Sequence, residues 1–275
     1  MTDLYYDIAG SGPVLLVVPG GAGHPMGLDG MTARLAERFT VVTYDPLGLA
    51  HGRLGLPVAD QRVEDWSDGA GRVLDAVLPD GQAAYVFGSS AGGVVALDLL
   101  ARHPERLRHV VAHEPPSVGV LPDGARHQAM FAEVCDRYRA AGLAAAGSLM
   151  TAMLTSSEPM EIPQEIPEVQ RLSREEELAS PMALSLRHVL RPFTSYIPDL
   201  ERLASLSSRL TVAAGTDSRG QLLHRTAEFL AQALDGDFAE FPGGHLGAVQ
   251  HPVPFAERLA ETLVPVGVPG ATATT

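Results

Sequence analysis

The feature that most constrains the fold of this chain is an alternation of short apolar runs with helical patterns. The apolar runs occur at Val14–Val18, Thr40–Tyr44, Ala83–Phe87, Arg108–Ala112, Leu210–Ala214 and Phe238–Phe241. Helical patterns lie between them at Met31–Arg38, Val63–Leu78, Ala91–Arg102, Leu222–Leu234 and Phe255–Leu263. This alternation is typical of a parallel sheet covered by helices on both faces, an α/β fold. We also expect Leu4–Ile8 to add an antiparallel strand at one edge.

The alternation stops between residues 115 and 207, where no strand pattern occurs. This stretch contains helical patterns at Ala125–Ala146 and Pro181–Leu190, separated by a segment rich in proline and glutamate. We therefore predict a core made of residues 1–114 and 208–264, with residues 115–207 inserted as a helical cap. Such a cap covers the carboxyl edge of the sheet, where doubly wound folds bind ligands.

The predicted cap carries apolar residues at helical spacing. They are Met130, Phe131, Val134, Tyr138, Leu149, Met150, Met153 and Leu154. Those that face the sheet edge would select an apolar substrate, and the alternative is that they pack the cap onto the core. The small and polar residues 265–275 are expected to be a disordered tail.

Composition restricts the classes of partner. The net charge of −13 argues against nucleic acid or an anionic membrane surface, because both require a basic surface. The single cysteine, Cys135, excludes an intramolecular disulfide and a cysteine zinc site, and it is expected to be a buried thiol. The N-terminal residues lack a signal-peptide pattern, and no apolar run reaches the ~18 residues of a membrane span. We expect a cytoplasmic protein with a small-molecule substrate, and a homo-oligomer is compatible with this sequence.

The strongest local motif lies where the strand Ala83–Phe87 meets the helix Ala91–Arg102. The linking sequence GSSAG matches the G-x-S-x-G nucleophile elbow, a tight turn between strand and helix. Ser90 is its central residue, and Ser89 lacks glycines at the required offsets. The elbow holds its serine in a strained conformation, and its glycines let neighbouring backbone approach closely. The alternative is a glycine-rich turn without chemistry.

Two further glycine-rich segments supply the other parts of an acyl-transfer site. The first core strand runs into PGGAG, and we predict that the backbone N–H groups of Gly21 and Ala91 form the oxyanion hole. The segment PGGH follows the last strand and offers His245 as general base. His251 is the rival, although it precedes a proline at an expected helix start. The remaining histidines are scattered, and they form no recognisable metal-ligand pattern.

Together, GSSAGG, PGGAG and PGGH resemble motifs of the α/β-hydrolase superfamily, and the likeness extends over nearly the whole chain. The segment YDPLGLAHG resembles a conserved turn of the same family, in which Asp45 would be structural. The resemblance implies a mostly parallel, doubly wound sheet and a triad of serine, histidine and acid. It implies no cofactor and no metal.

The acid of the triad has two candidates. Asp217, in GTDS after the strand Leu210–Ala214, stands where most family members carry it. Glu114 ends the preceding core strand in VVAHEPP, 24 residues after Ser90. The HEPP segment resembles zearalenone-type lactonases, in which a glutamate at this place completes the triad. Because two prolines would also fix the backbone that carries it, we favour Glu114 and keep Asp217 as the alternative.

These residues predict a hydrolase that cleaves a small hydrophobic carboxylic ester or lactone through an acyl-enzyme on Ser90. One alternative is that the same fold performs cofactor-independent oxygenation or perhydrolysis. Another is a non-catalytic protein that binds a small molecule, although such a protein has no need of a nucleophile elbow.

Overall fold

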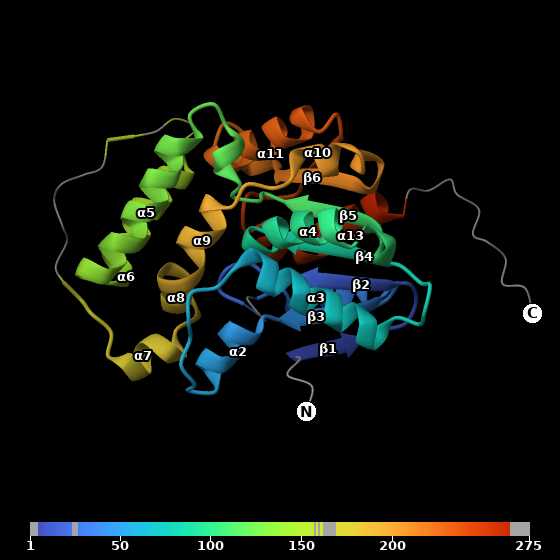
Figure 1. Cartoon of the computed structure of the whole chain (residues 1–275), viewed down its shortest axis with the longest axis horizontal. Coiled ribbons are helices and arrows are strands. Elements are labelled where there is room, and N and C mark those ends of the chain that lie inside the picture. Colours follow the sequence, from blue (N-terminus) through green and yellow to red (C-terminus); the bar gives the residue numbers. More distant parts are fainter. Residues whose placement is uncertain (1–4, 24–26, 157, 159, 162–168, 265–275) are drawn as a thin grey trace, which may run out of the picture.

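The computed structural model describes residues 5–23, 27–156, 158, 160–161 and 169–264 (Figure 1). A seven-stranded sheet lies at its centre, in the order β1-β3-β2-β4-β5-β6-β7. The strands are β1 Tyr5–Ala9, β2 Val14–Val18, β3 Thr40–Asp45, β4 Ala84–Ser89, β5 Leu107–His113, β6 Leu210–Gly215 and β7 Asp237–Phe241. Only β1 is antiparallel to its neighbour, and the other strands are all parallel. The predicted sheet and its antiparallel edge are confirmed.

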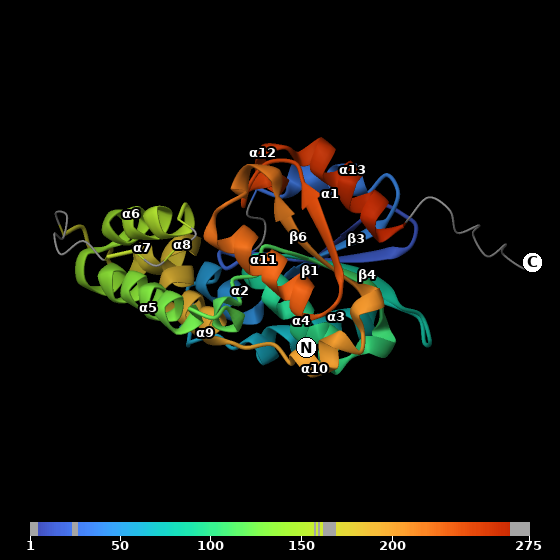
Figure 2. The ribbon, with the colours of Figure 1, turned by 90° about the horizontal axis from the view of Figure 1, so that it is seen from above.

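Helices cover both faces of the sheet because successive side chains of a strand point to opposite faces. Leu16 and Val18 of β2 lie in one apolar cluster, the α4-side core, while Leu15 and Val17 lie in another, the α13-side core. Figure 2 shows the two helical layers on either side of the sheet. The α4 side includes α3 Val63–Val77, α4 Ala91–Arg102, α10 Leu200–Ala204 and α11 Leu222–Ala233. The α13 side has α1 Asp29–Leu35, α12 Gly247–Gln250 and α13 Pro252–Leu263.

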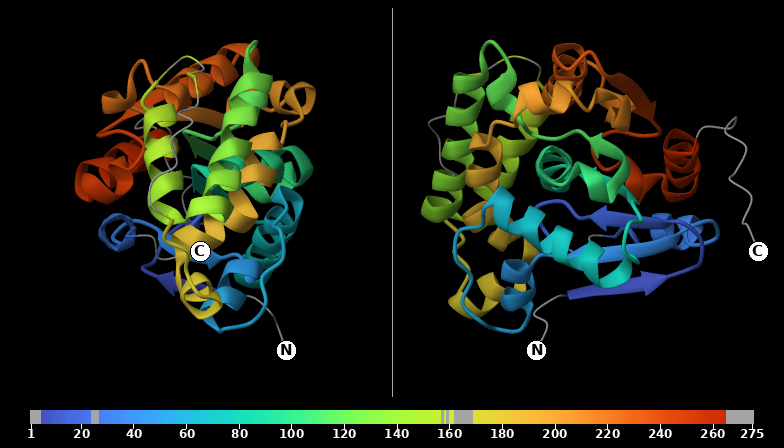
Figure 3. Two further views of the ribbon diagram at one scale, coloured as in Figure 1. Left: turned by 90° about the vertical axis from the view of Figure 1, so that its left-hand side faces the viewer. Right: turned by 45° about the vertical axis from the view of Figure 1, so that its right-hand side comes forward.

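The chain between β5 and β6 forms a helical insertion beside the sheet (Figures 1 and 3). Its main elements are α5 Gly124–Ala141, α6 Leu143–Leu154, α7 Arg174–Ala179, α8 Pro181–Leu184, the π-helical turn η3 Ser185–Val189 and α9 Leu190–Ser195. Within its described part, the insertion contains helices and a single isolated bridge but no strand. Its division from the core as a cap stays a prediction.

The helical pattern over Ala125–Ala146 is not one continuous helix, because the structure has two helices separated by Gly142. Gly142 has a φ of +92°, which a side chain rarely adopts, and a Cβ there would overlap the carbonyl oxygen of Gln170. The chain therefore turns at Gly142, and α6 packs back along α5. The short helices α2 Leu47–Arg53 and α7 were not predicted, although Ser173 and Glu176 form a capping box at the start of α7.

Most of the apolar residues at helical spacing in the insertion pack against one another. Met130, Phe131, Val134, Tyr138, Leu149 and Met153 are buried in one insertion cluster with Leu222 and Leu223 of α11. Met150 and Leu154 pack against this cluster while only partly buried. The insertion thus has a small apolar core of its own, joined to the sheet domain through α11.

Two sequence expectations concern the ends of the chain and the membrane. Residues 265–275, predicted to be a disordered tail, lie outside the described residues. Among the helices that the structure does describe, none combines the length and the apolar character needed to cross a bilayer.

Candidate active site

The turn from β4 into α4 holds Ser90 in a left-handed conformation. Its φ is +55°, and such strain in a residue other than glycine costs on the order of 1–3 kcal/mol. The Ser90 N–H donates a hydrogen bond to the carbonyl oxygen of His113 at 2.9 Å, while its own carbonyl accepts from the N–H of Gly93 at 2.8 Å. The serine is therefore fixed between the end of β5 and the first turn of α4, with its side chain partly exposed.

The two glycines of the elbow are required by close backbone approach. A Cβ at Gly92 would overlap the carbonyl oxygen of Val18, at the end of β2, and would also crowd that of Pro19. A Cβ at Gly88 would overlap the carbonyl oxygen of Gly92 itself. The G-x-S-x-G pattern thus lets α4 begin directly against the loop that follows β2.

That loop brings Gly21 next to Ala91, the first residue of α4. A Cβ built on Gly21 would stand 3.8 Å from the Cβ of Ala91. The structure therefore places the two predicted oxyanion-hole residues side by side. The N-terminal end of a helix also carries a partial positive charge, which favours an anion beside Ala91.

Glu114 follows β5 directly and points toward His245. Its φ is +44°, and its N–H donates to the carbonyl oxygen of Ala213 in β6 at 2.8 Å. Its side chain is 0% exposed, and Oε2 lies 2.8 Å from Nδ1 of His245. Oε1 accepts hydrogen bonds from the Gly215 N–H at 3.0 Å and from the Ser218 hydroxyl. All these contacts suit an ionised carboxylate, which only accepts hydrogen bonds.

The electrostatic balance also favours an ionised Glu114. Burial by itself raises the pKa of this carboxyl, but the hydrogen bond from His245 and the neighbouring imidazoles and Ser218 outweigh it, and the pKa falls to about 2. The adjacent His113 is fully buried, and burial lowers its pKa to about 4. At neutral pH the site therefore contains a carboxylate beside a neutral His113.

His245 occupies the loop after β7 and remains 27% exposed. Its Nδ1 faces Glu114, which leaves Nε2 as the ring nitrogen that can serve a substrate or a nucleophile. The rival His251 is exposed and stands at the N-cap of α13. The structure thus brings Glu114 to His245 and positions Ser90 through the carbonyl of His113, the residue before Glu114.

Asp217 lies close to this loop but makes other contacts. Its side chain is exposed, and one carboxylate oxygen accepts a hydrogen bond from the hydroxyl of Thr216 at 3.3 Å. Its N–H donates to the carbonyl oxygen of Gly243 at 2.9 Å, which ties the β6 loop to the loop of His245. The carboxylate that hydrogen-bonds to Nδ1 of His245 in the structure is that of Glu114, and not that of Asp217.

Sequence reasoning missed the groups that hold the second oxygen of Glu114. Ser218 follows Asp217 and Gly215 precedes it by two residues, in the segment GTDS whose predicted site residue is Asp217. A serine next to a candidate acid is a weak signal, because its burial depends on η5 Thr216–Ser218, which turns the hydroxyl inward.

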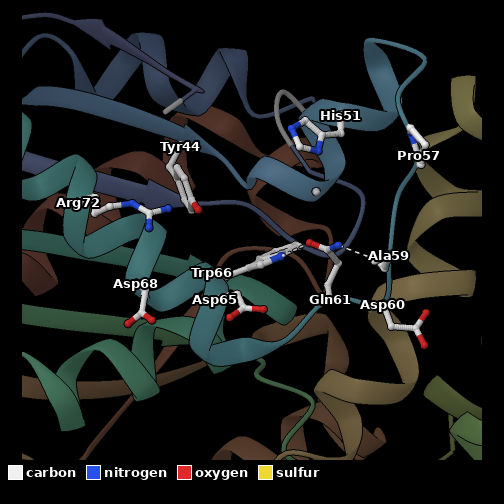
Figure 4. Close-up of a pocket in the computed structure, with 11 residues that line it drawn as sticks. Tyr44, His51, Pro57, Ala59, Asp60, Gln61, Asp65, Trp66, Asp68 and Arg72 are labelled. Atoms are coloured by element: carbon white, nitrogen blue, oxygen red, sulfur yellow. Dashed lines mark hydrogen bonds between the residues drawn. The ribbon is translucent and has the colours of Figure 1, made fainter. Parts of the chain in front are cut away.

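A second polar hollow lies away from these residues, between α2 and α3 (Figure 4). This cleft of about 410 Å³ is lined by Asp60, Asp65 and Asp68, with Trp66 and Arg72 beside them. None of the predicted site residues lines it. Among the described residues, no group of three histidine, cysteine or carboxylate side chains is placed to hold a metal ion. Cys135 is buried on α5.

Comparison with known proteins supports the fold. The chain is 31% identical over 266 residues to the uncharacterized hydrolase YraK of Bacillus subtilis, covering 95% of this chain and 92% of YraK. A thermophilic esterase from Thermogutta terrifontis superposes with a TM-score of 0.68 at 20% identity, covering 94% and 92% of the two chains. An enol-lactonase from Burkholderia xenovorans LB400 gives a TM-score of 0.59 at 16% identity, covering 94% and 96%.

The family assignment comes from a match that spans most of the chain. The model of the alpha/beta hydrolase fold family matches residues 13–252, which include the elbow, the loop of Gly21, Glu114 and the loop of His245. The mostly parallel sheet and the strand–turn–helix at Ser90 agree with that match. The chain belongs to the alpha/beta hydrolase family.

Proposed function

We propose that this protein is a serine hydrolase that cleaves carboxylic esters or lactones through an acyl-enzyme on Ser90. The observation that carries the proposal is the 2.8 Å hydrogen bond between buried Glu114 and His245, next to a strained nucleophile elbow. A protein that only binds a ligand gains nothing from a left-handed serine or from a buried carboxylate that orients an imidazole. The esterase and lactonase names of two structural relatives support the same chemistry.

In the first half-reaction, Ser90 Oγ attacks the substrate carbonyl carbon while Nε2 of His245 takes the hydroxyl proton. The carbonyl π electrons move onto oxygen, and the N–H groups of Gly21 and Ala91 stabilise that oxyanion. The intermediate then collapses, the bond to the alcohol oxygen breaks, and His245 returns the proton to the leaving alkoxide. Glu114 stays ionised throughout and stabilises the imidazolium.

In the second half-reaction, water attacks the acyl-enzyme. His245 takes one proton from the water as the new C–O bond forms, and collapse expels Ser90 Oγ, which recovers that proton. An ester yields an acid and an alcohol, whereas a lactone yields one hydroxy acid. Perhydrolysis differs only in that hydrogen peroxide replaces water and a peracid leaves.

The helical insertion supplies the substrate side of the site in this proposal. Val189 of η3 lies 3.6 Å from the position of a Cβ at Gly21, so an apolar side chain faces the proposed oxyanion hole. Val189 is buried in the α4-side core, so it closes this side of the proposed oxyanion hole.

The test uses Ser90→Ala with Ser89→Ala as a matched control, since both serines are partly exposed and adjacent. We expect Ser90→Ala to lose at least ~10³-fold in kcat on p-nitrophenyl esters and to lose labelling by a fluorophosphonate, whose fluoride Ser90 Oγ displaces. Ser89→Ala should keep both activities. A Ser90→Ala variant with near-normal turnover would overturn the proposal, and a wild-type protein that is neither labelled nor active would do so as well.

A further inference from the structure

The first residue of the π-helical turn η3 reaches the proposed oxyanion hole from the insertion. The Oγ atom of Ser185 lies 2.7 Å from the position that a Cβ would take on Gly21. The Cβ of Ala91 is 3.8 Å from the same point. Three segments distant in sequence therefore meet at one place: the loop after β2, the start of α4 and the insertion. Two of them already contribute the proposed N–H donors.

The hydroxyl of Ser185 is not used by the fold. Within the described residues it makes no hydrogen bond, although the side chain is half-buried. By contrast, Ser180 at the start of α8 accepts the N–H of Ala183 at 3.3 Å. Serine hydroxyls in helices commonly bond to a backbone carbonyl of the preceding turn, and Ser185 does not. Its proton is thus available to a group bound beside Gly21.

The turn that carries Ser185 is held from both sides. Leu184 and Val189 pack into the α4-side core, while Leu186 packs into the insertion cluster. At its other end the carbonyl oxygen of His188 accepts the N–H of Gln61 at 2.8 Å. Nδ1 of His188 also lies 2.9 Å from a carboxylate oxygen of Asp60. A donor on such a turn keeps its position while charge develops, which is the condition for electrostatic catalysis.

A π-helical turn inside an α-helical run is itself informative. Such turns are rare, and they are frequent at functional sites because the extra residue redirects neighbouring side chains. Here the turn lies between α8 and α9. The side chain that the turn delivers to Gly21 is Ser185.

We propose that Ser185 is a catalytic residue that donates a third hydrogen bond, from Oγ, to the oxyanion of the tetrahedral intermediate. This inference rests on the proposed function, because it requires an acyl-transfer step at Ser90. It adds a side-chain donor to the two backbone donors, and it makes the insertion part of the catalytic apparatus. The competing role is packing, in which the side chain of Ser185 only fills space against Gly21.

Ser185→Ala and Ser185→Cys separate these roles. Cysteine keeps the shape of serine but is a weak donor, so a packing role predicts near-normal behaviour for Ser185→Cys. A donor role predicts that both variants lose about 10- to 100-fold in kcat, with little change in KM, because the bond strengthens only in the transition state. Ser195→Ala, on the exposed end of α9, is the control and should match the wild type.

The second measurement is the rate of labelling by a fluorophosphonate, which needs no knowledge of the natural substrate. The phosphoryl oxygen of the transition state occupies the oxyanion hole, so we expect labelling of Ser185→Ala and Ser185→Cys to slow about 10-fold or more. Unchanged labelling and kcat in both variants, or a change confined to KM, would overturn the inference. Absence of labelling in the wild type would instead count against the proposed function.

Discussion

The hydroxyl of Ser218 donates a hydrogen bond to Oε1 of Glu114, the carboxylate oxygen that does not face His245. Ser218 is buried, and its Oγ also lies 2.8 Å from the carbonyl oxygen of Gly215. The loop after β6, which carries the acid in most family members by the resemblance described above, here binds an acid that projects from β5. It therefore supports His245 indirectly, through Glu114.

This relationship makes Ser218→Ala the first prediction. Loss of the hydroxyl removes one hydrogen bond to a buried charge, so the free energy of unfolding should fall by about 1.5–3 kcal/mol. We expect kcat for ester hydrolysis to fall as well, because Glu114 would be held by fewer partners. Urea unfolding and steady-state kinetics measure the two effects. Thr216→Ala in the same loop is the control, and an equal loss there would contradict the assignment.

The second prediction compares the two candidate acids directly. Glu114→Gln should cost up to ~10⁴-fold in kcat, because an amide at this place favours the wrong tautomer of His245. Asp217→Asn should cost far less, because the Asp217 side chain is exposed and bonds to Thr216. Both variants keep the size of the side chain, so the fold should persist. A larger loss in Asp217→Asn would reverse the assignment of the acid.

The alternation of apolar runs and helical patterns was sufficient to predict a mostly parallel sheet and the bounds of β2 and α4. It succeeds because strands buried on both faces must be apolar throughout, whatever the surrounding sequence. The elbow at Ser90 was equally clear, since only glycines at positions 88 and 92 let α4 approach β2. The catalytic role of Ser90 stays a prediction.

The other parts of the site depend on contacts between segments far apart in the sequence. Glu114 and Asp217 both follow core strands, and the HEPP segment favoured Glu114 without deciding which carboxylate turns toward His245. The left-handed backbone of Glu114 and its bond to Ala213 decide that direction. Ser185 was missed for the same reason, because a π-helical turn arises from packing on two clusters rather than from residue type.

The third prediction concerns the glycines of the elbow. Gly92→Ala should lower the free energy of unfolding by at least about 3 kcal/mol, because its Cβ would overlap backbone that no side-chain rotation can relieve. Gly71 in α3 is a matched control, since a Cβ there meets nothing within 4 Å. Gly71→Ala should stabilise the protein by roughly 0.5–1 kcal/mol. Denaturant unfolding of both variants measures these free energies. A loss of less than about 1 kcal/mol in Gly92→Ala would contradict the close approach of α4 to β2.

The last prediction follows from the environment of His113. Its ring packs edge-on against Phe241 and Phe255, and among the described residues neither ring nitrogen has a hydrogen-bond partner. Burial lowers the pKa of His113 to about 4, against about 6.5 in an unfolded chain. Between these values the unfolded state binds a proton that the folded state does not, so stability must fall as the pH drops from about 6.5 to about 4.

His113→Leu should remove this acid sensitivity. The two pKa values predict that protonation of His113 lowers the free energy of unfolding of the wild type by about 2 kcal/mol between pH 7 and pH 5. The variant should lack that loss, while its free energy of unfolding at pH 7 changes much less. Glu114 does not produce the same effect. Its contribution to the free energy of unfolding is lost only as the pH falls from about 4.5 toward its lowered pKa of about 2. Urea unfolding at the two pH values measures the difference, with His103→Gln, whose ring is partly exposed, as the control. An equal pH dependence in wild type and His113→Leu would show that His113 is not the group that titrates.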